Sequence, residues 1–271
     1  MIFTCRPVLF GILILSAFSV APALAQERVY QLQVHPVFPP DQAEMVFRPL
    51  LSYLTAATGH SFELKTSRDF HRHWLDLRRG AQPDFVLEDA HLIAFRMKRD
   101  NYLPLVRAGA PTTFSLLTNR PERDLELADF VGLPVSTLPA PSLGHLVLAS
   151  WFQNPMQQPV IQSAATSWLE AVEIVFAREA EAAIVPNNLA SRYVNLGEVA
   201  VSSEFPHMSI AASANLDLNV ASSVQIALIA LNDDPDFFAV LHELDIERFV
   251  PADPAEYAGL ERWLDPIYSG D

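Results

Sequence analysis

The chain has 271 residues, of which 18 are basic and 32 acidic, and its formal net charge is −14 at pH 7. This length allows one large domain or two smaller lobes. The acidic balance argues against nucleic acid and against an anionic lipid surface as partners. Cys5 is the only cysteine, so neither a disulfide framework nor a thiolate centre is expected.

The first segment has the pattern of a secretory signal peptide over residues 1–25. Arg6 supplies a positive start, residues 8–20 are almost wholly apolar, and residues 23–25 read Ala-Leu-Ala. The apolar run is shorter than the ~20 residues of a membrane-spanning helix, although an uncleaved anchor is the alternative. We therefore expect cleavage after Ala25 and a periplasmic protein without a lipid anchor.

Strand and helix patterns alternate along the rest of the first half of the chain. The expected strands are residues 29–34, 62–64, 85–87, 103–107 and 114–118. The expected helices are residues 41–58, 69–79 and 90–99. Asp41 is placed to cap the first helix and Gly59 to end it.

A polar, proline-containing segment at residues 119–124 indicates the entry to a second lobe, where the rhythm repeats. Expected strands are residues 133–138, 160–162 and 182–185, and expected helices are residues 142–152 and 168–178. Residues 199–211 read as extended and residues 220–264 as helical with proline breaks. The predicted division is lobe 1 at 26–118, lobe 2 at 119–208, and a return crossing with C-terminal helices on lobe 1 at 209–271.

This order of elements predicts an α/β fold with mainly parallel sheets in two lobes and a cleft between them. Ligands of such sheets bind beyond the carboxyl ends of the strands. The loops at residues 35–36, 88–89, 139–142 and 186–188 are therefore the expected lining of a site.

Residues 47–59 (FRPLLSYLTAATG) resemble the first helix of the phosphonate-type periplasmic solute-binding proteins of ABC transporters. Residues 77–95, 132–152, 179–190 and 249–264 are similar to later segments of that family, in the same order. The resemblance covers nearly the whole chain after residue 25. It implies a type II periplasmic binding-protein fold whose lobes close on a ligand like a hinge.

The resemblance also implies an anion-binding loop at residues 139–144, followed by a helix that begins near Ser142, Leu143, Gly144 and His145. Free N–H groups at a helix start suit an anion, but the alternative is that Ser142 is only a helix cap, as most such residues are. The family loop is rich in serine and threonine, whereas only Ser142 keeps a hydroxyl here. His91 stands where the family has a pocket tyrosine.

Further candidates follow from position alone. Glu88 and Asp89 directly follow an apolar strand, where they would bind a cationic or amine-bearing ligand or cap the next helix. The complete set of predicted ligand-binding residues is His35, Phe38, Glu88, Asp89, His91, Ser142, Leu143, Gly144, His145, Thr166 and Asn187. Asn187 offers an amide that both donates and accepts, and Phe38 offers an aromatic face.

Three histidines of this set, His35, His91 and His145, would suggest a metal if they converged, but their spacing is not a metal-binding motif. We therefore predict no metal and no cofactor. His71 and His73 lie two apart on an expected helix and are predicted to be surface residues. No serine-hydrolase elbow, zinc-protease motif, phosphate loop or dinucleotide fingerprint is present, so no enzyme is predicted.

The function expected from these observations is capture of a small polar or charged molecule, phosphonate- or phosphate-like if the family resemblance extends to the ligand. The predicted partner of this monomer is an ABC permease or, alternatively, a membrane sensor protein. A periplasmic enzyme is the rival from another functional class, and a structural or chaperone-like role is a third.

Overall fold

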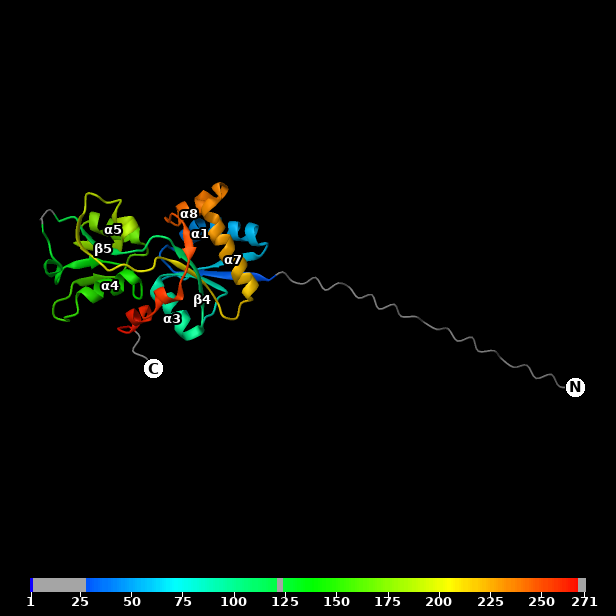
Figure 1. Ribbon diagram of the computed structural model, residues 1–271. Helices are drawn as coiled ribbons and strands as arrows, with labels where there is room; N and C mark the ends of the chain where they lie inside the picture. The colour runs from blue at the N-terminus through cyan, green and yellow to red at the C-terminus, as the bar shows by residue number, and fades with distance from the viewer. Residues whose placement is uncertain (2–27, 121–123, 268–271) are drawn as a thin grey trace.

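The computed structural model describes Met1, residues 28–120 and residues 124–267. Apart from Met1, the signal peptide expected over residues 1–25 lies outside the described residues. Within the described ranges, no helix combines the length and the apolar character that a membrane crossing requires. The described chain forms two lobes, each built on its own β-sheet (Figure 1).

The sheet of the first lobe has the strand order β11-β4-β10-β3-β1-β2. Its strands are β1 (Val29–Val34), β2 (Ser61–Lys65), β3 (Phe85–Glu88), β4 (Leu103–Ala108), β10 (Ser209–Ala212) and β11 (Phe249–Pro251). β1 is parallel to β2 and to β3, whereas β10 and β11 pair antiparallel with their neighbours. The sheet is therefore mixed rather than mainly parallel, because the chain returns to this lobe along β10 and β11.

Helices cover both faces of this sheet. They are α1 (Pro40–Thr58), α2 (Phe70–Arg78), α3 (Ala90–Asp100), α7 (Leu218–Ala230) and α8 (Phe238–Glu243), with short turns η2 (Leu231–Asp233), η3 (Pro235–Phe237) and η4 (Pro254–Tyr257). Phe85 and Leu87 of β3 pack in the core with α1 and α7, and Val86 packs on the opposite face with α3. The alternation of side chains along a strand explains why β3, whose residues 85–87 are apolar and buried on both faces, is a central strand.

The sheet of the second lobe has the strand order β7-β6-β8-β5-β9. Its elements are β5 (Phe114–Thr118), η1 (Leu127–Phe130), β6 (Pro134–Ser136), α4 (Leu143–Trp151), β7 (Val160–Gln162), α5 (Trp168–Phe176), β8 (Ala182–Pro186), α6 (Asn187–Ala190) and β9 (Gly197–Val201). β5 pairs antiparallel with β8 and β9. The chain therefore enters the second sheet at Phe114, ahead of the boundary expected at residue 119, because an apolar strand fits either sheet equally well.

Extended crossings at residues 109–113 and 202–208 join the lobes. They pair with each other at Thr112 and Phe205, whose backbone N–H groups donate to each other's carbonyls at 3.0 and 2.9 Å. Adjacent crossings of this kind give a hinge, because a few residues absorb the rotation of one lobe against the other.

The C-terminal segment contacts both lobes. The turn η5 (Leu260–Leu264) packs on α3 of the first lobe, and Lys98 of α3 binds Glu261 at 2.9 Å. Leu264 shares an apolar cluster with Leu146 of the second lobe, and the rings of Trp263 and Phe205 lie 5.3 Å apart. The expected packing on lobe 1 is thus only part of what this segment does.

Candidate functional site

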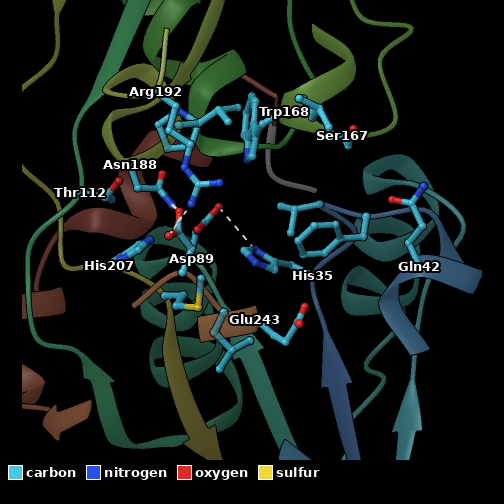
Figure 2. A pocket seen from close by; sticks show the side chains of 18 of the residues that line it. His35, Gln42, Asp89, Thr112, Ser167, Trp168, Asn188, Arg192, His207 and Glu243 are labelled. Carbon is cyan, nitrogen blue, oxygen red and sulfur yellow. Dashed lines mark hydrogen bonds and ion pairs between the residues drawn. The ribbon is translucent and has the colours of Figure 1, made fainter. Parts of the chain in front are cut away.

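A cavity of about 450 Å³ lies between the lobes. Figure 2 shows side chains from both lobes pointing into it. The first lobe contributes His35, Val37, Phe38, Gln42, Phe47, Asp89, His207, Met208, His242, Glu243, Leu244 and Asp245. The hinge and the second lobe contribute Thr112, Phe114, Ser167, Trp168, Leu169, Pro186, Asn188, Leu189, Arg192 and Tyr193. Hereafter we call this cavity the cleft.

His35 and Asp89 form the floor of the cleft. His35 follows β1 and Asp89 follows β3, and these parallel neighbours end at the same edge of the sheet. The backbone N–H of His35 donates to the Leu87 carbonyl at 3.0 Å, which fixes the loop. The two side chains face one another (Figure 2), with His35 Nδ1 3.5 Å from Asp89 Oδ2.

The Asp89 carboxylate has few partners for a buried acid. Asp89 is 8% exposed, and although it precedes α3 its side chain makes no capping hydrogen bond. Burial raises the pKa of Asp89, but the nearby imidazoles of His35, His91 and His207 outweigh it, so the pKa lies below its usual value. Asp89 is therefore an anion at neutral pH. The buried Nε2 of His35 likewise has no hydrogen-bond partner among the described residues.

Trp168 forms the opposite wall. It begins α5, which Ser167 caps by accepting a hydrogen bond from the Glu170 backbone N–H. The indole packs edge-on against Phe114, with ring centroids 5.6 Å apart. Large aromatics at this position give the cleft an apolar face opposite a charged one.

Contacts between the lobes cross the mouth of the cleft. Asp245 lies in the first lobe just after α8, and Arg192 and Asn188 lie in the second. Arg192 Nη2 is 2.5 Å from Asp245 Oδ1, and Asn188 Nδ2 donates to Asp245 Oδ2 at 2.8 Å. The described conformation is therefore a closed one, in which a polar bridge spans the lobes.

The predicted anion loop does not line the cleft. Ser142 and Leu143 are fully buried, and the Ser142 hydroxyl donates to the Leu138 carbonyl and accepts from the His145 N–H. A methyl group added at Gly144 would lie 2.6 Å from Cη2 of Trp168, so the indole rests directly on this helix start. His145 instead faces a separate hollow near Trp263, and burial lowers its pKa.

The remaining predicted residues have other neighbours. His91 is fully buried, and its Nε2–H donates to the Pro141 carbonyl across the lobes at 2.8 Å. Thr166 is exposed and bonds through its N–H and hydroxyl to Glu170. Asn187 lies beside the hinge, where its Oδ1 accepts from the Thr112 hydroxyl at 3.2 Å. Of the predicted set, His35, Phe38 and Asp89 line the cleft.

Glu88 points away from the cleft into a buried charged cluster. Arg96 donates to both of its oxygens, at 2.7 and 2.8 Å, and His73 Nε2–H donates to it at 2.7 Å. Burial raises the pKa of Glu88, but Arg96 and His73 hold it far below its ordinary value. His73 is fully buried, so the prediction that it lies on the surface is wrong. The face of α2 that carries His73 packs against the sheet, where the buried Glu88 carboxylate accepts the hydrogen bond from His73.

Several lining residues escaped the sequence analysis. Arg192, His207, Glu243 and Asp245 lie in loops or helix ends whose place depends on how the lobes meet, and no local pattern marks them. Asn188, by contrast, belongs to the loop at residues 186–188 that was expected to line the site, and Trp168 is the first residue of an expected helix. Among the described residues, no three His, Cys, Asp or Glu side chains are placed to hold a metal ion.

Comparison with known proteins agrees with this architecture. A model of the family described as "ABC transporter, phosphonate, periplasmic substrate-binding protein" matches residues 32–257, whereas no curated protein sequence matches the chain. PhnD1 from Prochlorococcus marinus, solved with methylphosphonate, has a TM-score of 0.72 at 12% identity over 88% of this chain and 98% of that one.

Other solved structures share the fold. XAC2383 from Xanthomonas citri, solved with ATP, has a TM-score of 0.69 at 17% identity, covering 88% of this chain and 98% of its own. The binding component PA3383 of an ABC phosphonate transporter from Pseudomonas aeruginosa has a TM-score of 0.69 at 14% identity, with 89% and 84% covered. The chain thus belongs to the phosphonate-type periplasmic substrate-binding protein family of ABC transporters.

Proposed function

We propose that this protein binds a small solute reversibly between its lobes and presents the closed form to an ABC permease, without converting the solute chemically. One observation carries the proposal: a cavity of about 450 Å³ has walls from both lobes and lies beside the hinge. Pockets for small molecules have volumes of roughly 300–1,000 Å³. The family membership supports both the transport role and the permease as partner.

A ligand in this cleft would couple binding to closure. It would touch His35 and Asp89 on one lobe and Trp168 on the other, and these contacts exist together only in the closed form. The bridge from Arg192 to Asp245 is weak by itself, since the two side chains are 58% and 42% exposed and such pairs contribute only ~0–1 kcal/mol. The ligand would therefore add contacts to both lobes that the exposed bridge cannot replace, and so would favour the closed form.

The test measures the distance between the lobes. We would express the whole chain, purify it from the periplasmic fraction, and label Glu44→Cys and Glu173→Cys, which are exposed positions on lobe 1 and lobe 2. Phosphonates, phosphate, amino acids, amines and metal ions are then screened by energy transfer and thermal unfolding. We expect one class to shorten the distance and to stabilise the fold by ~2.7 kcal/mol at a hundred times its dissociation constant.

The control pair, Glu44→Cys with Glu247→Cys, lies within one lobe and should report no change. If no solute alters either distance or stability, the binding function is wrong. Consumption of the bound solute by the purified protein would instead contradict the absence of chemistry.

A further inference from the structure

The helix start that would receive an anion is filled by the protein itself. On one side the Pro141 carbonyl accepts a hydrogen bond from His91, and on the other the Trp168 indole rests on Gly144. None of residues 139–145 lines the cleft. A phosphonate group would have to displace a buried histidine or the indole to reach these N–H groups. The geometry therefore withholds the N–H groups of this helix start from a doubly charged oxyanion in the cleft.

The charged side chains that do line the cleft are mainly acidic. Asp89, Glu243 and Asp245 contribute carboxylates. Among the described lining residues, Arg192 is the one Arg or Lys, and Asp245 already engages it. Burial lowers the pKa of His207, so this imidazole is neutral at pH 7. The cleft consequently presents negative charge to a solute.

The buried His35 lacks hydrogen-bond partners among the described residues and points to a ligand, and the charged Asp89 lies beside it. The carboxylate of Asp89 does not cap α3, and its contact with His35 Nδ1 at 3.5 Å is longer than a firm hydrogen bond. His35 is 3% exposed, lines the cleft, and leaves its buried Nε2 without a partner among the described residues. Buried polar groups ordinarily have partners, so a ligand atom belongs between this pair and the opposite wall.

The aromatic side chains of the cleft suit the apolar part of a cation. Trp168 and Phe38 both line the cleft, and an indole is the aromatic side chain that attracts a cation most strongly. A carboxylate together with aromatic faces, Trp168 across the cleft and Phe38 on the same lobe as Asp89, is what a protonated amine with a hydrocarbon portion requires.

We propose that the cleft selects a small organic ammonium compound, whose N–H groups donate to Asp89 and whose hydrocarbon part lies against Trp168 and Phe38, and that it rejects phosphonates. This inference rests on the proposed function, because it specifies the solute that the two lobes enclose.

The test compares probes that share a shape and differ in charge. Phenethylamine, 2-phenylethanol and 2-phenylethylphosphonate are titrated into the whole exported protein by calorimetry, together with ethanolamine, cadaverine and methylphosphonate. We expect at least one ammonium probe to bind, and phenethylamine to bind about 10- to 100-fold more tightly than the alcohol, as for a hydrogen bond to a charged group. Both phosphonates should bind no better than the alcohol.

The Asp89→Asn variant keeps the shape of the side chain and removes its charge. It should reduce the preference for amine over alcohol to less than about 3-fold, whereas Glu179→Gln, at an exposed site outside the cleft, should leave it intact. If Asp89→Asn does not fold, the preference of the wild-type protein for amine over alcohol remains a complete test.

Some outcomes overturn the inference and leave the function standing. Lobe closure with a phosphonate, or with any solute while every ammonium probe fails, would show a binding protein with a different ligand class. An amine preference that survives Asp89→Asn would remove Asp89 from the site. Failure of every solute in both assays would overturn the proposed function as well.

Discussion

Glu88 and Asp89 are adjacent in the chain and carry the same functional group, yet their surroundings differ completely. Glu88 is the last residue of β3 and points into the lobe, where Arg96 and His73 satisfy its oxygens. Asp89 points to the cleft, where its carboxylate faces His35 and does not cap α3. One residue of register along a strand reverses the direction of the side chain, and here it separates a structural acid from a candidate ligand-binding one.

The buried pair predicts a large effect on stability. Glu88→Gln leaves the Arg96 guanidinium buried and uncompensated, and should lower the free energy of unfolding by about 3–5 kcal/mol in urea titrations at pH 7. Arg96→Met should cost a similar amount, and the double variant should cost less than the sum. An additive double variant would mean that the two groups do not interact.

The same pair sets a response to acid. The pKa of Glu88 in the folded protein lies below its ordinary value of 4.5, so the stability it contributes is present above about pH 4.5 and is lost as the pH falls further. Unfolding curves of Glu88→Gln should therefore depend less on pH below 4.5 than those of the wild type.

Single residues also show where sequence reasoning succeeds. His35 and Asp89 could be placed together because parallel neighbouring strands end at one edge of a sheet. The burial of His73 could not be predicted, because it depends on a hydrogen bond to Glu88, which lies 15 residues further along the chain. A local sequence pattern predicts an element and its periodicity, but it does not predict which residue of another element its side chains contact across the core.

At the scale of elements, the start of α4 and the start of α5 pack on each other. Gly144 of α4 touches the Trp168 ring of α5 closely enough that no side chain fits between them. Both helices are capped by a serine, Ser142 and Ser167, that accepts a backbone N–H bond. The loop that was expected to bind an anion is, in this contact, packed behind the Trp168 ring.

Adding one methyl group tests this packing. Gly144→Ala should force the indole to move, at a cost of about 1–3 kcal/mol in the free energy of unfolding, and should change tryptophan emission. Gly197→Ala is the matched control, because its added carbon would meet Thr118 at an ordinary 3.7 Å. Equal effects of the two variants would contradict the close contact seen at Trp168.

The elements of the first half of the chain follow their sequence patterns well, since caps and apolar periodicity are local. The return to lobe 1 was less predictable. β11 lies where the sequence reads as part of a broken helical tail, and only its pairing with β4 makes it a strand. Antiparallel strands that close a sheet from a distant part of the chain depend on tertiary contacts rather than on propensity.

At the scale of the whole molecule, the region between the lobes contains the buried His91 and the half-buried His145 and His207. Burial lowers the pKa of His91, His145 and His207. Because the unfolded chain then binds more protons than the folded one below the ordinary value of 6.5, stability should rise with pH across this range. We expect the melting temperature to fall as the pH is lowered from 7.5 to 5.5.

Replacing His91 by Gln should flatten that dependence, while His71→Gln, at an exposed position of α2, should leave it as in the wild type. A melting temperature that is constant between pH 5.5 and 7.5 would contradict the prediction.

Residues such as Arg192 and Asp245 belong to this scale too, since their meeting across the cleft follows from the orientation of the lobes and from nothing local in sequence.

The turn η5 adds a third attachment to the hinge. The crossings at residues 109–113 and 202–208 lie side by side. By themselves they would allow one lobe to twist as well as to bend relative to the other. Because η5 holds α3 on one side and packs against Leu146 and Phe205 on the other, torsion between the lobes is opposed. We therefore expect the lobes to open and close by one bending rotation about the crossings, which would return Trp168 to the same position facing Asp89.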